Sequence, residues 1–158
     1  MPPVFTFASG RAVFRTVRNG RDNGYNGNGN GYNGNGYNGN GYNGNGYNGN
    51  GFGRRRLRLR YRLVLENIRR VTEAHIHLGR PGQNGPIVAY LFGPNRRGIS
   101  FGRGVITGVL SNRDLVGPLR GGTIRQLIRE IERGNAYVNV HTRRNPDGEI
   151  RGQIRRVF

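Results

Sequence analysis

Three histidines are the residues of this sequence whose type and spacing could support chemistry. His75 and His77 are separated by one residue, and His141 follows much later in the chain. Residues two apart on a β-strand project from the same face, so His75 and His77 are expected side by side. Neutral imidazole nitrogens are good ligands for Zn and Cu, and three of them form a common ligand set. The sequence therefore offers a three-histidine site for Zn or Cu.

A structural role is the other interpretation of these histidines, in which they are buried and hydrogen-bonded where strands pair. Glu73 lies on the same strand face as His75, but the chain has no fourth histidine and no aspartate in phase with the others. The incomplete ligand set favours the structural interpretation. The sequence thus predicts no cofactor, and Zn or Cu stays open as the alternative.

The other polar residues do not form a catalytic set. The chain has no cysteine and only eight acidic residues, and no Ser/His/Asp group or pair of carboxylates stands out. The glycine-rich stretch lacks the Lys-Ser/Thr ending and the following helix of a phosphate-binding loop. We therefore expect a protein without enzymatic activity.

Arginine dominates the charge of the chain. The formal net charge is +18, and all 26 basic residues are arginine, which favours attraction to polyanions. One row alternates strictly with apolar residues and comprises Arg54, Arg56, Arg58, Arg60 and Arg62. Alternate residues on one strand face lie about 7 Å apart and repel each other unless a partner intervenes. This row is our candidate binding face for a polyanion such as a glycan, a nucleic acid or an acidic protein.

A low-complexity segment occupies residues 19–53. It repeats the unit Gly-Tyr-Asn-Gly-Asn, and its aromatic positions are Tyr25, Tyr32, Tyr37, Tyr42, Tyr47 and Phe52. Asn-Gly is a strong tight-turn dipeptide because both residues tolerate positive φ. The segment is interpreted either as a solvated linker or as a strip of aromatic contacts that holds copies of the chain together.

The rest of the chain predicts a mainly β domain with one short α-helix. Residues 4–18 indicate two short strands, residues 57–65 and 71–78 two more, and residues 87–92, 99–110, 136–142 and 149–157 the remainder. Thr123 with Gln126 forms a capping box, and Gly134 ends the helix that begins there. Short strands with turn signals between them favour an antiparallel β-sandwich or barrel. The whole chain, residues 1–158, is expected to form a single domain, with residues 19–53 inserted in its first hairpin.

Two segments resemble the CHRD (chordin) domain family. One is Ala74 to Gly79 with Gly82 to Val88, and the other is Gly134 to Thr142 with Asn145 to Ile154. The resemblance implies an immunoglobulin-like or Cu/Zn-dismutase-like antiparallel sandwich, no established catalytic activity and, usually, secretion. In comparison with the family, the sequence begins one strand late and shows no signal peptide, so an unpaired sheet edge is expected.

From these observations we expect a structural or adhesive protein that assembles with itself into a homo-oligomer or filament, as in a surface layer or fibre. The proposed joining strand is the alternating stretch Val4, Phe5, Thr6 and Phe7. An arginine-rich module for polyanions or nucleic acid is the first alternative, and a three-histidine metal protein is the second. No transmembrane segment is expected. A spore surface or the cell exterior, reached without a recognisable signal peptide, is the expected location, and a cytoplasmic one stays open.

Overall fold

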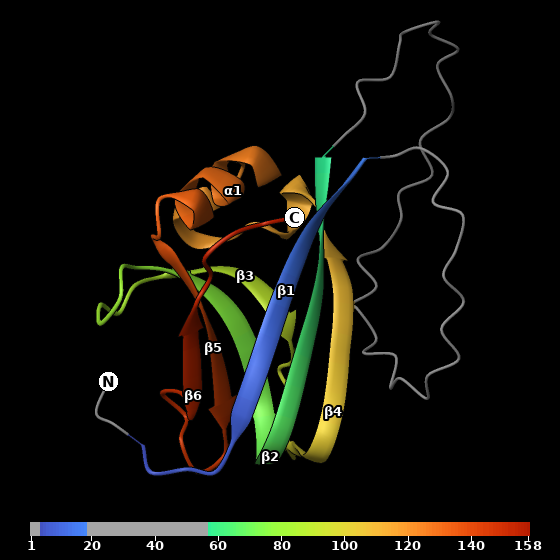
Figure 1. Ribbon diagram of the computed structural model, residues 1–158, viewed down its shortest axis with the longest axis vertical. Coiled ribbons are helices and arrows are strands. Elements are labelled where there is room, and N and C mark those ends of the chain that lie inside the picture. Colours follow the sequence, from blue (N-terminus) through green and yellow to red (C-terminus); the bar gives the residue numbers. More distant parts are fainter. Residues whose placement is uncertain (1–3, 19–56) are drawn as a thin grey trace, which may run out of the picture.

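A computed structural model describes residues 4–18 and 57–158 of the chain. Its elements, in chain order, are β1 (Ser9–Arg18), β2 (Leu57–Leu78), β3 (Ile87–Phe92), β4 (Ile99–Leu110), the 3-10 turns η1 (Asn112–Asp114) and η2 (Gly117–Leu119), α1 (Ile124–Glu132), β5 (Ala136–Thr142) and β6 (Ile150–Gln153). All strand pairs are antiparallel, and the sheet curls on itself (Figure 1). The prediction of a mainly β, sandwich-like antiparallel fold with one short α-helix is confirmed.

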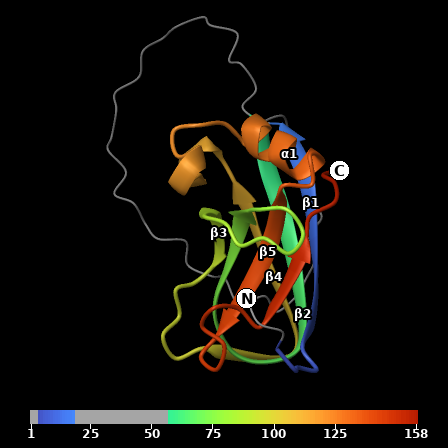
Figure 2. The same cartoon turned by 90° about the vertical axis from the view of Figure 1, so that its left-hand side faces the viewer.

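The long strand β2 belongs to both halves of the curled sheet. Its first half lies between β1 and β4, and its second half lies between β3 and β5, with β6 beyond β5 (Figures 1 and 2). Val71 marks the changeover, because it pairs with Ile99 of β4 and with Thr142 of β5. One strand thus carries Arg58, Arg60 and Arg62 together with two of the three histidines.

The sequence predicted two strands where the structure has the single strand β2, and the backbone explains the error. Asn67 and Arg70 adopt positive φ angles of 51° and 54°, and the register of β2 against β4 shifts between Ile68 and Val71. Such irregularities bend a strand and change which residues point inward without ending the pairing. The alternating pattern that stops after Leu65 therefore marks a bend in β2 and not its end.

The helix α1 forms as predicted and closes one end of the sheet. Thr123 and Gln126 make both hydrogen bonds of the capping box, and Gly134 adopts a φ of 70° just after the helix. The apolar stripe of Ile124, Leu127 and Ile131 is fully buried in the core that β2 and β5 supply. Among the described residues, no helix is long and apolar enough to cross a membrane.

The two ends of the chain differ from the expectation. Within residues 4–18 there is one strand, β1, which begins at Ser9, and residues 4–8 have no regular structure. The last strand ends at Gln153, but the chain continues to Phe158, whose backbone exchanges hydrogen bonds with Phe14 and Thr16. This pairing covers part of the β1 edge that faces away from β2.

Candidate metal centre and basic sheet face

The register of β2 and β5 brings the three histidines onto one face of the sheet. Directly opposed residues of an antiparallel pair share a face, and Glu73 lies opposite His141. His75 and His77 occupy the next positions of the same face along β2. The residues that alternate with them, Ala74 and Ile76, are fully buried in the core on the other face.

Loops cover the histidine face, so this half of β2 is buried on both sides. The side chain of His75 is 2% exposed and that of His77 is 8% exposed, whereas His141 is half-buried. The loop after β2 contacts His77 through Gly85, and the loop after β5 contacts His141 through Pro146. The cluster therefore opens to solvent on the His141 side.

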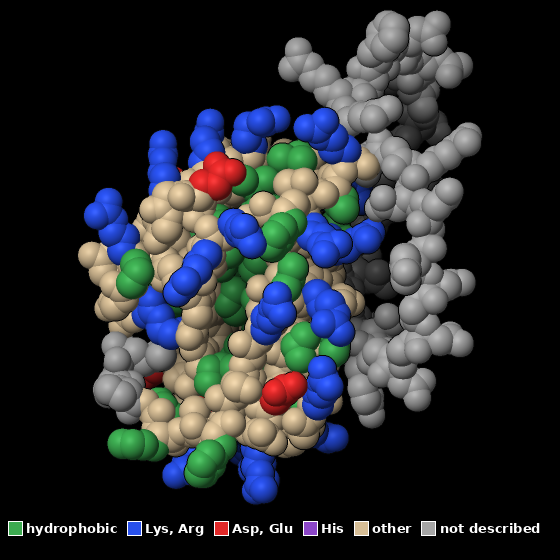
Figure 3. Space-filling model, in the orientation of Figure 1, with side chains coloured by type: hydrophobic (Ala, Val, Ile, Leu, Met, Phe, Trp, Pro, Cys, Tyr) green, Lys and Arg blue, Asp and Glu red, His purple; other side chains and the backbone are tan. Residues whose placement is uncertain are grey.

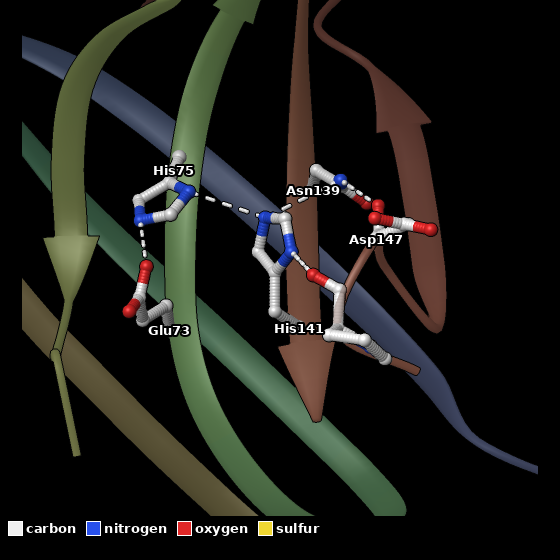
Figure 4. A network of polar contacts seen from close by, with 6 residues as sticks. Glu73, His75, Asn139, His141 and Asp147 are labelled. Carbon is white, nitrogen blue, oxygen red and sulfur yellow. Dashed lines mark hydrogen bonds and ion pairs between the residues drawn. The ribbon is translucent and has the colours of Figure 1, made fainter. Parts of the chain in front are cut away.

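Each histidine has one ring nitrogen held by an oxygen atom. His77 donates from Nδ1 to the Gly85 carbonyl at 2.9 Å, and His141 donates from Nδ1 to the Pro146 carbonyl at 2.7 Å. Nε2 of His75 lies 2.9 Å from a carboxylate oxygen of Glu73, within ion-pair distance, although the geometry falls short of a hydrogen bond (Figure 4).

The remaining ring nitrogens of the three histidines lie close together. Nδ1 of His75 is 3.1 Å from Nε2 of His141, and Nε2 of His77 is buried without a hydrogen-bond partner. One ligand atom from each of the three residues lies within 4.8 Å of the others. The sequence predicted that His75 and His77 share a face, and the structure adds His141 to them.

Burial disfavours the charged form of His75 and His77. Desolvation, together with the neighbouring His141 and His77, lowers the pKa of His75 to about 3. Burial also lowers the pKa of His77, although its hydrogen bond to Gly85 acts in the opposite direction. Neutral imidazole is the form that binds metal.

An aromatic and cationic stack fixes the loop that holds His77. The ring of Tyr137 stacks on His77 with centroids 4.9 Å apart, and its hydroxyl accepts a hydrogen bond from the Gly85 amide at 3.1 Å. The Arg151 guanidinium lies 3.6 Å from the centre of the Tyr137 ring and donates to Gln83 and Asn84. This stack holds the Gly85 carbonyl in place, and that carbonyl determines which ring nitrogen of His77 carries the proton.

A second candidate site is the outer face of β1, β2 and β4, which we call the basic face. The side chains that project from it are Ser9, Arg11, Val13, Arg15 and Val17 on β1, Arg58, Arg60, Arg62, Val64 and Glu66 on β2, and Arg103, Val105, Thr107 and Val109 on β4. Arg15 lies directly opposite Arg60 in the ladder. The Glu66–Arg103 contact at 3.3 Å adds one acidic group at the margin. Arginine side chains are also spread widely over the view in Figure 3.

The structure places only some of the remaining candidates. Arg58, Arg60 and Arg62 are exposed on the basic face, as expected. Arg54, Arg56 and all six aromatic positions of the repeat, Tyr25, Tyr32, Tyr37, Tyr42, Tyr47 and Phe52, lie outside the described residues. Of the candidate joining strand, Val4 is half-buried, and Phe5, Thr6 and Phe7 are exposed.

Sequence reasoning missed several contributors to both sites. Arg11 and Arg15 belong to the basic face, and their alternation with Ala12 and Phe14 was a signal for it. Nothing in the sequence signalled the carbonyl groups of Gly85 and Pro146. Every residue has a backbone carbonyl, so the residue type does not reveal which one will contact a histidine. Loop placement alone brings them to the histidines.

The comparisons with known proteins identify one family. The family model of the CHRD domain matches residues 49–154, which is about two thirds of the chain. The match contains β2 to β6 and all three histidines, and β1 lies before it. The comparisons with curated proteins and with solved structures give no match.

Proposed function

The chain belongs to the CHRD domain family, and we propose that it is a non-catalytic module that joins copies of itself into a surface layer or fibre. CHRD domains are typically extracellular protein-interaction modules, and the family is not known as enzymatic. Family membership supports an interaction role, and self-assembly is our specific form of it. A spore surface or another extracellular surface is the proposed location.

The observation that carries the proposal is the exposure of two phenylalanines near the N-terminus. Phe5 and Phe7 are 104% and 97% exposed, so neither side chain contributes to the core of its own domain. Residues 4–8 form no strand, and Thr6 links them to the domain by donating to Glu149 at 2.7 Å. Two apolar rings left in water favour burial against another chain.

An acceptor for this segment exists on β4. β4 pairs with β2 along one edge, and in the described part of the chain its other edge has no backbone partner. The exposed Val105 and Val109 flank that edge. An open edge presents unpaired N–H and C=O groups that invite another strand.

The positions of donor and acceptor determine the kind of assembly. In Figure 1 residues 4–8 run along the lower left of the domain, whereas β4 forms its right-hand edge. A contact between two different surfaces is head-to-tail, so it produces a ring or an open filament and not a two-fold dimer. We therefore propose that residues 4–7 of one copy add to β4 of the next.

Light scattering and negative-stain microscopy of the purified full chain test this proposal. Phe7→Pro removes a backbone donor and should abolish assemblies while leaving a folded monomer. Phe7→Tyr keeps both the donor and the aromatic ring and serves as the matched control. Val105→Lys places a charge beside the β4 edge and should have the same effect as Phe7→Pro. Assemblies that survive both Phe7→Pro and Val105→Lys would contradict strand addition.

A second candidate function is binding of a linear polyanion on the basic face. The gathering of Arg11, Arg15, Arg58 and Arg62 on this face supports it, because clustered positive charge attracts anionic partners. The arginine and hydroxyl side chains of the face suit contacts with anionic groups, and no aromatic ring for stacking with bases projects from the described part of the face. Among polyanions we therefore favour an anionic glycan over a nucleic acid.

Salt-dependent binding to heparin tests the second candidate, with poly(dT) as the comparison. Arg58→Gln and Arg62→Gln should each weaken heparin binding and reduce the salt slope by about one unit. Arg125→Gln on the exposed side of α1 removes the same charge away from the face and should change binding little. Equal effects of all three substitutions would show non-specific attraction to the net charge, and tighter binding of poly(dT) would favour nucleic acid.

A further inference from the structure

We propose that His75, His77 and His141 bind one divalent cation, Zn²⁺ or Cu²⁺, through one nitrogen each and leave a fourth coordination position open. The basis is that one ring nitrogen of each histidine lies within 4.8 Å of the others and has a lone pair to donate. This site is independent of the proposed joining of copies, because residues 4–7 and the β4 edge take no part in it.

The oxygen atoms around the cluster decide which nitrogen of each ring carries the proton. A backbone carbonyl only accepts, so His77 and His141 must both carry hydrogen on Nδ1. Their Nε2 atoms then hold lone pairs. The Glu73 carboxylate beside Nε2 of His75 favours a proton there, which leaves the lone pair on Nδ1.

The three lone pairs lie in an arrangement that costs free energy without a positive charge between them. Nδ1 of His75 and Nε2 of His141 face each other at 3.1 Å, and with these protons in place neither donates to the other. The side-chain amide nitrogen of Asn139 lies 3.4 Å from Nε2 of His141, at the long end of hydrogen-bond distance. Nε2 of His77 is buried and has no partner at all. Buried polar atoms without a partner are rare in folded proteins and point to a missing ion or water. A bound cation satisfies all three nitrogens at once.

The second layer of contacts matches what metal-binding histidines require. Such histidines almost always donate their other ring N–H to a carboxylate, a backbone carbonyl or water, which fixes the orientation of the ring. Here backbone carbonyls fill that role for His77 and His141, and the Glu73 carboxylate lies at ion-pair distance, 2.9 Å, from Nε2 of His75. A cluster that was merely buried and hydrogen-bonded would not need one nitrogen of each ring to lie within 4.8 Å of the others.

The chemistry and spacing of the donors select the ion. Three imidazoles without thiolate suit Zn²⁺ and Cu²⁺, with Cu²⁺ the tighter binder in general. Nitrogens at about 2.0–2.1 Å from a tetrahedral ion are about 3.3 Å apart. The His75–His141 pair already has nearly this spacing, and the widest separation, at most 4.8 Å, closes by rotation of side chains.

The cluster also has a route of entry and a free position. His141 is half-buried, so an ion reaches the site from its side. Three protein ligands leave one tetrahedral position for water or for a group from another molecule. Glu73 is aimed at Nε2 of His75 and not at the point where the lone pairs meet, so it positions His75 and is not a ligand.

Calorimetric titration of the metal-free full chain with ZnCl₂ and, separately, CuSO₄ tests the proposal. One ion per chain is expected. His141→Asn should weaken binding at least 100-fold, and Glu73→Gln should weaken it by about 10-fold or more through loss of positioning. Tyr90→Phe is the matched control, because Tyr90 packs edge-on against His75 at 4.7 Å but is no ligand.

Electron paramagnetic resonance of the Cu²⁺-loaded wild type keeps the test valid if His141→Asn does not fold. These three are the only histidines of the chain, so coupling of copper to three imidazole nitrogens identifies the site without any substitution. Absence of a stoichiometric Zn²⁺ or Cu²⁺ complex overturns the proposal. Fewer than three coupled nitrogens, or unchanged affinity in a folded His141→Asn chain, also overturns it.

Discussion

The two halves of β2 show how differently one strand can be used. In the first half the alternation of leucine and arginine puts one face in the core and the other in solvent, and the exposed face joins β1 and β4 in a basic surface. In the second half both faces are buried, because loops cover the histidines while Ala74 and Ile76 pack into the core. The first half presents many similar charges over an area. The second half holds a few groups at fixed distances.

Burial on both faces of the strand is what restricts the histidine rings enough to form a site. On the open half of the strand a ring would be solvated and free to change its rotamer and protonation. On the covered half each ring meets an oxygen atom that leaves it one orientation. The two sites we propose on β2 thus depend on different physics, long-range charge in one case and local geometry in the other.

The largest expected difference between the halves is in stability. Ile76→Ala removes a fully buried side chain, and we expect it to lower the free energy of unfolding by about 2–5 kcal/mol. Arg62→Ala on the exposed face should change it by no more than about 0.5 kcal/mol. Chemical denaturation of both variants measures this. Similar effects of the two substitutions would contradict the contrast in burial.

Acid should lower the stability of the metal-free protein through His75 on the covered half of β2. The unfolded chain protonates His75 near its ordinary pKa of 6.5, whereas the folded chain resists until about pH 3. The unfolded state therefore binds more protons between these values, and stability falls as the pH drops through this window, by about 1.4 kcal/mol per pH unit for one proton. The groups that face His75 are Glu73, His77, His141 and Tyr90.

Denaturation curves between pH 7 and pH 4 measure this dependence. Because burial is its main cause, the loss should persist in about 0.5 M salt, which screens interactions between surface charges. A stability that stays constant over this range would show that His75 is not held neutral in the fold.

A smaller loss of stability is expected from a substitution where the first half of β2 packs against β4. A Cβ at Gly108 would collide with the ring and hydroxyl of Tyr61, whose hydroxyl donates to the Leu91 carbonyl at 2.7 Å. Gly108→Ala should therefore cost about 1–3 kcal/mol. Gly102→Ala on the same strand is the control, because nothing lies within 4 Å of its Cβ position. Equal unfolding temperatures for the two variants would contradict this packing.

The smallest effect on stability is expected from removing the repeat. Arg18 and Leu57 are paired at the ends of β1 and β2, so residues 19–56 connect two adjacent strand ends. A two-residue Asn-Gly turn joins such ends directly, and long insertions cost little closure entropy. The shortened chain should melt at or slightly above the temperature of the parent. Failure to fold would show that the repeat belongs to the core.

The fold was largely predictable because its signals are local. The capping box of Thr123 and Gln126 and the alternation from Leu57 to Leu65 depend on neighbouring residues, and both gave the correct element. The continuity of β2 was not predictable, because the residue type of Arg70 gives no signal for its positive φ, which lies within the register shift against β4.

Of the candidate site, the three ligands were visible in the sequence, but their convergence was not. His75 and His77 share a face by the period of a strand. The approach of His141 depends on the register of β2 against β5, and the protonation of the rings depends on two loop carbonyls. Strand register and loop position depend on the tertiary fold, and no residue type signals them. This is why the sequence alone favoured a structural role for the histidines.

The proposed metal site depends most on which nitrogen of each histidine carries the proton. A long-range ¹H–¹⁵N correlation spectrum of the metal-free chain measures this directly. With three histidines in the chain, six ring nitrogens are to be assigned. We expect hydrogen on Nδ1 of His77 and His141 and on Nε2 of His75, with the other three nitrogens shifting when one equivalent of Zn²⁺ is added. Hydrogen on Nε2 of His77 or His141 would contradict the convergence of lone pairs from which the metal site is inferred.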